Sequence, residues 1–169
     1  MISLRIEIIR KISKPVSPFR DHFKNFENNQ AVQKIFGEQT QDVLDNLEVE
    51  FTDSTIYMRV DYDGRLLVNP RYLASGDLTE LYLDVIHELV HVRQVLNGKN
   101  CNHALPYVER PLELEAYQTA VDEARALGWS KRRILRYLDS DLINCAELRK
   151  LAAAMGIDAE EESLPEEND

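Results

Sequence analysis

The amino-acid sequence predicts a small α+β protein, and the change in its hydrophobic period is the main evidence. Apolar and polar residues alternate between residues 47 and 69, as in strands, whereas apolar residues recur at helical spacing from residue 77 onward. A chain of 169 residues is long enough to bury one core without disulfides. We therefore expect one domain over 1–157, with a small antiparallel sheet packed on a central helix and further helices after it. Residues 158–169 are expected to form a flexible acidic tail.

The N-terminal part of the chain carries weaker signals. Residues 2–12 alternate apolar and charged side chains and suit a strand, although their spacing also permits a helix. Two prolines within 15–18 then interrupt the pattern. Apolar residues recur at helical spacing over 19–36, and a short helix is expected over 39–45.

The middle of the chain reads as three short strands. Residues 47–51 and 56–60 each alternate apolar with polar side chains, and 65–69 continues the pattern. The segment 61–64 has the composition of a turn. We expect these strands to form an antiparallel meander.

The next segment predicts a central helix. Asp77 and Glu80 have the spacing of a capping box, which places the start of the helix there. Apolar residues then cover most of the circumference as far as Asn97, and a helix that is apolar nearly all round is buried.

The C-terminal third is expected to be helical. Pro111 suits the first position of a helix over 112–127. Ser130 can cap a helix over 131–138, and 146–155 can form the last one.

Composition narrows the possible partners and location. A formal net charge of -10 and a pI near 4.9 argue against nucleic acid, because phosphate binding needs a basic surface. No apolar run is long enough for a membrane span, and the N-terminus does not resemble a signal peptide, so we expect a cytoplasmic protein with no membrane partner. Cys101 and Cys145 are expected to be free thiols.

The motif with the clearest chemistry is His87-Glu88-Leu89-Val90-His91, on the predicted central helix. Residues i and i+4 share a helix face, so His87 and His91 can bind one zinc ion. Glu88 is rotated by about 100° from His87, and projects beside the ion, where it can accept a proton from water. Polar groups on a buried helix need a compensating partner, and a metal ion would supply one.

A third ligand is required, since catalytic zinc sites usually combine three protein ligands with water. The extended motif with a third histidine is absent, because Gln94 stands where a glycine and Asn97 where a histidine would be needed. A carboxylate on the following helix is the remaining choice.

Two glutamates on that helix differ in their surroundings. Glu113 shares an apolar stripe, whereas Glu115 shares a polar one. The apolar stripe contains Tyr117, Ala120, Val121 and Ala124, and the polar stripe contains Gln118, Thr119 and Asp122. A buried carboxylate needs a compensating charge, so the pattern favours Glu113 as ligand, with Glu115 as the fallback.

These two segments together resemble the gluzincin branch of zinc metallopeptidases, especially the single-domain minigluzincins. The resemblance implies a zincin-like fold, a zinc ion held by His87, His91 and Glu113, and peptide hydrolysis with Glu88 as general base. Tyr117 departs from the aspartate or asparagine that often supports a histidine ligand in that clan. Asp84, one turn before His87, is a possible substitute in that supporting role.

Other residues are candidates for stabilising the transition state. His103 and Tyr107 lie in the connection between the two ligand helices, where a loop could lie over the metal. Further candidate donors are Arg110, Arg132 and Tyr137. The resemblance also implies that a peptide substrate lies antiparallel to an edge strand from the 55–69 hairpin.

One alternative of a different class stays open. The zinc site could be vestigial or could stabilise a non-catalytic module whose acidic tail and C-terminal helices bind a partner. Residues 131–133 and Arg136 make a local basic patch, which is more typical of a solvated helix face than of a docking surface. The presence of Glu88 favours the enzyme, because a purely structural metal does not need a neighbouring carboxylate.

Overall fold

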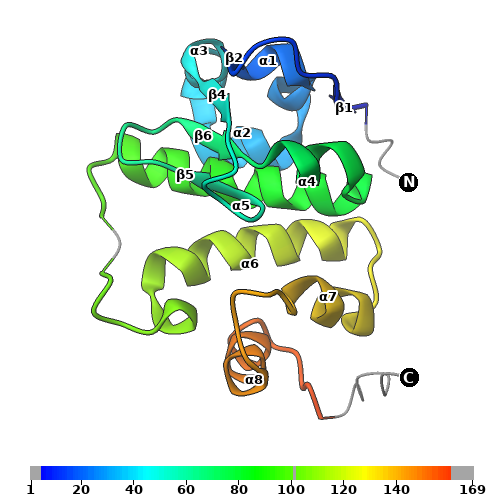
Figure 1. Ribbon diagram of the computed structural model, residues 1–169. Helices are drawn as coiled ribbons and strands as arrows, with labels where there is room; N and C mark the ends of the chain where they lie inside the picture. Colours follow the sequence, from blue (N-terminus) through cyan, green and yellow to red (C-terminus); the bar gives the residue numbers. More distant parts are fainter. Residues whose placement is uncertain (1–4, 101, 161–169) are drawn as a thin grey trace. The chain divides into compact units, whose positions relative to one another are not determined.

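The computed structural model describes residues 5–100 and 102–160. The chain divides into two compact units, Met1–Asn100 and Cys101–Asp169, and each is described by itself. The first unit holds the strands and the second has helices only among its described residues (Figure 1). The predicted mixed α+β class is confirmed.

The elements of the first unit are short apart from one helix. Its strands are β1 (Glu7–Ile8), β2 (Val16–Pro18), β3 (Phe23–Lys24), β4 (Glu48–Phe51), β5 (Met58–Val60) and β6 (Leu66–Val68). Its helices are α1 (Phe19–His22), α2 (Gln30–Phe36), α3 (Thr40–Asn46), α4 (Pro70–Ser75) and α5 (Leu78–Leu96), with 3-10 turns η1 (Phe26–Asn28) and η2 (Gly37–Gln39).

The main sheet is mixed, so the predicted antiparallel meander is wrong. Its strand order is β2-β4-β6-β5, and β4 pairs with β6 in parallel while the other two pairings are antiparallel. Strand β6 thus lies between β4 and β5. All three of its residues are buried, as expected for a central strand covered on both faces. Arg65 adds ion pairs of 2.9 and 3.0 Å to Glu48 and Glu50 of β4.

The helical spacing over 19–36 does not produce one helix. Helix α1 ends at His22, β3 pairs with β1, and Asn25 adopts a left-handed φ of 67° before α2 begins. The spacing instead builds an aromatic cluster, in which the Phe19 ring lies 4.9 Å from Phe23 and 5.6 Å from Phe26. Asparagine tolerates the left-handed region and caps helices, and Asn29 accepts the first backbone N–H groups of α2.

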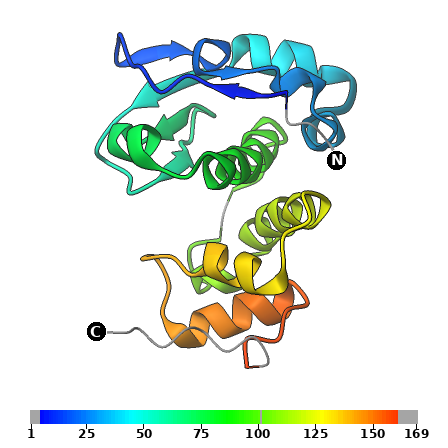
Figure 2. The same cartoon turned by 90° about the vertical axis from the view of Figure 1, so that its right-hand side faces the viewer.

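The central helix of the first unit is α5, as predicted. Asp77 caps it by accepting hydrogen bonds from the backbone N–H groups of Thr79 and Glu80. The helix packs against β5 and α2, and Figure 2 views it nearly end-on. Most of its residues are buried, including His87 and Glu88. The motif therefore lies on a rigid element of the core.

Helix α4 was not predicted. Pro70 occupies its first turn, and the Asn69 side chain accepts hydrogen bonds from the N–H groups of Arg71 and Tyr72. The guanidinium of Arg10 donates to backbone carbonyls at its C-terminal end, including that of Leu73 at 3.0 Å. Pro70 therefore follows the end of β6 and also begins α4.

The second unit contains η3 (Tyr107–Glu109), α6 (Pro111–Ala126), α7 (Lys131–Leu138) and α8 (Cys145–Ala154). The predicted starts at Pro111 and Ser130 are confirmed, and Ser130 accepts from the N–H of Arg133. Asn144 and Glu147 form a capping box at α8. No helix in the described part of the chain is long and apolar enough to cross a membrane.

Some expectations concern residues that the structure leaves undescribed. Cys101 and residues 161–169 of the predicted acidic tail lie outside the described residues, as do residues 2–4 of the first predicted strand. Within the described part, residues 7 and 8 form the only strand over 2–12. Cys145 is a free, exposed thiol, as expected.

Candidate metal centre

The two motif histidines converge on one point in the first unit. They lie one turn apart on α5, and their Nε2 atoms are 3.1 Å from each other. The ring centroids are 4.9 Å apart with an interplanar angle of 72°. His87 is 6% exposed and His91 is half-buried. The helical spacing predicted this convergence, and the side-chain rotamers realise it.

The separation of these nitrogens fits a shared zinc ion. Two nitrogens bound tetrahedrally at 2.0–2.1 Å lie about 3.3 Å apart, which is close to the observed 3.1 Å. Two imidazole lone pairs at that distance repel each other unless a proton or a cation lies between them. Either a shared proton or a shared metal ion would account for this separation.

Glu88 is a buried residue of the same helix turn. Its side chain is 7% exposed, and it follows His87 directly on the helix. A step of about 100° around the axis turns its side chain away from the line joining the two imidazoles. This position suits a base that acts beside a ligand pair better than a ligand.

Gln94 is a functional candidate that the sequence analysis missed. Its side chain is 2% exposed, and its Oε1 lies 2.7 Å from Nδ1 of His91. The signal was present in the sequence, because an amide three residues after a histidine shares its helix face.

Asp84 has a partner from another helix. The hydroxyl of Tyr72 on α4 donates a hydrogen bond to its carboxylate. Burial, together with the negative charge of Asp84, raises the pKa of the Tyr72 hydroxyl far above its usual range, so the phenol stays protonated. The Tyr57 ring lies against Tyr72 with centroids 5.1 Å apart. Asp84 is thus part of a phenol–carboxylate pair between α4 and α5.

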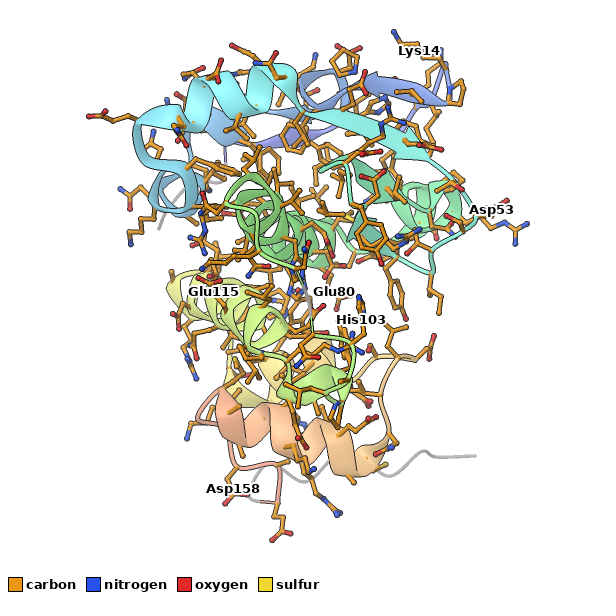
Figure 3. The ribbon with its side chains drawn as sticks, turned by 90° about the vertical axis from the view of Figure 1, so that its left-hand side faces the viewer. Lys14, Asp53, Glu80, His103, Glu115 and Asp158 are labelled. Atoms are coloured by element: carbon orange, nitrogen blue, oxygen red, sulfur yellow. The ribbon has the colours of Figure 1, made fainter. Side chains whose placement is uncertain are left out.

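The two candidate glutamates of the second unit differ in burial, as the composition of their helix stripes predicted. Glu113 is 8% exposed, whereas Glu115 is half-buried and has polar neighbours along its stripe. Figure 3 labels Glu115 on α6 and His103 on the segment before η3. His103 is exposed.

The tyrosines of the second unit form a pair of their own. The hydroxyl of Tyr107 lies 3.2 Å from that of Tyr117, with the rings edge to face. Among the other proposed donors, the Arg110 guanidinium donates to the Leu105 carbonyl at 3.1 Å, and the Tyr137 ring contacts Trp129. Arg132 is exposed.

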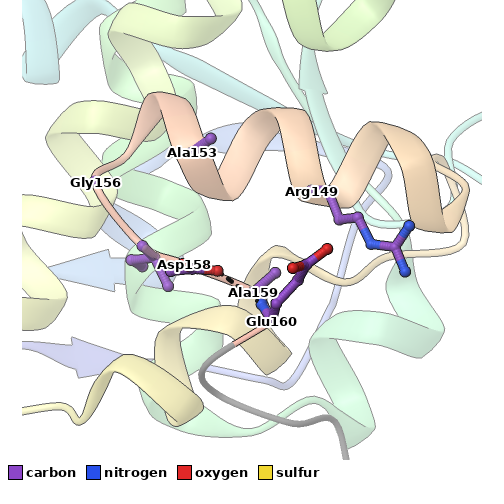
Figure 4. A pocket seen from close by; sticks show the side chains of 7 residues that line it. Arg149, Ala153, Gly156, Asp158, Ala159 and Glu160 are labelled. Atoms are coloured by element: carbon purple, nitrogen blue, oxygen red, sulfur yellow. Dashed lines mark hydrogen bonds between the residues drawn. The ribbon is translucent and has the colours of Figure 1, made fainter.

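The second unit also has a pocket near the end of α8. Figure 4 shows it at the C-terminal end of α8 and the turn that follows. It is lined by Arg149, Ala153, Gly156, Ile157, Asp158, Ala159 and Glu160. None of the predicted site residues lines it.

Comparison with known proteins identifies no relative of this chain. No family model, no curated protein and no solved structure matches this chain.

Proposed function

We propose that this protein is a zinc-dependent peptide-bond hydrolase. The observation that carries the proposal is the pair of imidazole Nε2 atoms 3.1 Å apart on α5, where the buried Glu88 follows His87 directly. Two histidines and an adjacent glutamate in this spacing are the arrangement that zinc hydrolases use.

The proposed ligand set is His87, His91 and Glu113. Glu113 supports this choice because it is a buried carboxylate in the first turn of α6, on an otherwise apolar stripe. Two histidines and one glutamate leave a fourth position on zinc for water, as in catalytic sites. With this set, the proposal extends to a zincin-like fold and to a gluzincin-like enzyme.

Glu88 is the proposed general base. When bound, zinc lowers the pKa of water toward about 7 and polarises the carbonyl under attack. Glu88 takes the proton as water adds to the peptide carbonyl carbon, and then gives it to the leaving amine nitrogen. Burial of Glu88 keeps bulk water from competing for that proton.

An extended peptide is the proposed substrate. Strand β5 is an edge strand of the main sheet, so a peptide can pair with it by backbone hydrogen bonds. This mode reads the backbone and demands little of the substrate's side chains. It favours unfolded or loop segments of a protein substrate.

The first test is metal analysis combined with two substitutions. The purified protein is expected to hold about one zinc per chain, and His91→Ala is expected to lose it. Glu88→Gln is expected to keep the zinc while hydrolysis of a peptide library falls by at least about 100-fold, since a general base contributes roughly 10²–10⁴-fold.

Two results would contradict the proposal. If the wild-type protein takes up no zinc, the proposed metal site is wrong. Zinc-loaded wild type that cleaves nothing in the library, with Glu88→Gln indistinguishable from it, would favour the zinc-stabilised interaction module instead.

A further inference from the structure

His91 is held at both of its ring nitrogens. Its Nε2 faces the Nε2 of His87 at 3.1 Å, and its Nδ1 faces the amide oxygen of Gln94 at 2.7 Å. All three side chains come from α5, so the helix itself sets their spacing. The contact with Gln94 is the shorter of the two.

The chemistry of the amide oxygen determines where the proton of His91 sits. A neutral imidazole carries one N–H, and an amide oxygen can only accept a hydrogen bond. Nδ1 of His91 must therefore donate to Gln94, which leaves the lone pair on Nε2. That lone pair points at His87, toward the place where the proposed zinc would bind.

We propose that Gln94 is a positioning residue, which locks His91 in the Nδ1-protonated tautomer so that Nε2 is ready to bind a metal. The part of this inference that concerns metal affinity rests on the proposed function. The part that concerns the tautomer does not, because it can be measured in the zinc-free protein.

The burial of Gln94 explains why this lock is effective. Gln94 is 2% exposed, so its amide oxygen is shielded from water and is available to the ring of His91. An amide on an apolar helix face costs free energy unless it is hydrogen-bonded, and a leucine or methionine would pack there without that cost. Groups that orient a histidine ligand in this way typically change metal affinity by about 10–100-fold.

The arrangement also predicts the state of the partner histidine without zinc. Since Nε2 of His91 carries the lone pair, Nε2 of His87 must donate the proton of the 3.1 Å contact. The two histidines are thus expected to be opposite tautomers in the zinc-free protein. Zinc binding then requires the proton of His87 to move from Nε2 to Nδ1, which keeps the ring neutral and leaves both Nε2 lone pairs for the ion.

The decisive measurement is ¹⁵N NMR of the histidine rings in zinc-free protein, above the pKa of imidazole. In wild type, His91 is expected to show a pyrrole-like Nδ1 and a pyridine-like Nε2. Gln94→Met removes the acceptor at similar size, and His91 is expected to become a mixture of tautomers. Gln94→Glu keeps an acceptor and is expected to restore the wild-type pattern.

Zinc competition with a chromophoric chelator gives the second measurement. Gln94→Met is expected to weaken zinc binding by about 10–100-fold, while Gln94→Glu binds at least as tightly as wild type. The matched control is Gln33→Met on α2. The exposed amide of Gln33 donates a hydrogen bond to the backbone carbonyl of Glu27 at 3.0 Å, and does not contact the histidines in any hydrogen bond described. The control is expected to leave both tautomer and affinity unchanged.

The two proposals fail in different ways. A pyridine-like Nδ1 on His91 in wild type overturns the role of Gln94 whether or not zinc binds, and it needs no variant to fold. An unchanged tautomer and affinity in a folded Gln94→Met protein overturns it too. Wild type that shows the expected tautomer but takes up no zinc overturns the proposed function and leaves the lock in place.

Discussion

Glu113 and Glu115 are two residues apart on α6 and differ in exposure, which makes them a matched pair. Under the proposal, Glu113→Gln removes a zinc ligand and is expected to weaken zinc binding by at least about 100-fold, beyond the usual effect of residues that only orient ligands. Glu115→Gln changes the same chemical group on the polar stripe and is expected to leave affinity within about 2-fold of wild type. The chelator competition assay measures both.

The reverse result has a clear meaning. If Glu115→Gln lost zinc and Glu113→Gln kept it, the ligand would be Glu115, and the burial argument would be wrong. If both variants kept zinc, neither glutamate would be a ligand, and the gluzincin-like set would fail.

At the scale of single residues, the sequence could predict contacts within one helix but not contacts between helices. The spacing of His87 and His91 predicted their convergence, because i and i+4 share a helix face by geometry alone. The hydrogen bond between Gln94 and His91 was not predicted, although the same rule covers it. The pairing of Asp84 with Tyr72 could not be predicted, since it joins two helices.

At the scale of elements, the cap of α5 contributes to the rigidity of the motif. Asp77 accepts two backbone N–H groups at 2.9 and 3.0 Å, which otherwise lack helical partners. Asp77→Ala is expected to lower the free energy of unfolding by about 1 kcal/mol, and Asp77→Asn by much less, because asparagine caps as well. Urea denaturation followed by circular dichroism measures the difference.

Asp53 supplies the control for this prediction. It is exposed in the turn after β4, and Asp53→Ala removes a like charge. It is expected to change stability by no more than about 0.5 kcal/mol. A loss in Asp53→Ala equal to that in Asp77→Ala would mean that charge, and not capping, is responsible.

Helix boundaries followed local rules closely. Asp77, Pro111 and Ser130 begin α5, α6 and α7 as expected, because caps and N1 prolines act within one turn. Helix α4 was missed because its signal, Asn69-Pro70, ends a strand equally well.

At the scale of the whole molecule, zinc is expected to stabilise the folded chain. A ligand that binds only the folded state adds about 2.7 kcal/mol at a concentration 100 times its Kd. Zinc is therefore expected to raise the unfolding temperature of the protein. Calorimetric scans with and without a chelator measure this, and His91→Ala is expected to show no shift.

A different thermal result would limit the proposal. If zinc left the unfolding temperature of the wild type unchanged, the folded chain would not bind the ion preferentially. An equal shift in His91→Ala would show that zinc binds elsewhere.

By itself, the sequence determined the α+β class, the helix α5 with its cap, the face shared by His87 and His91, and the buried stripe of α6. Each follows from periods of two or 3.6 residues and from caps, which act over a few positions. Only the tertiary structure decided that β6 lies parallel to β4, that residues 19–36 break into shorter elements, and that the Gln94 amide contacts the ring of His91. A period shows that a strand forms but not which strand becomes its neighbour. That choice depends on packing between segments far apart in the chain.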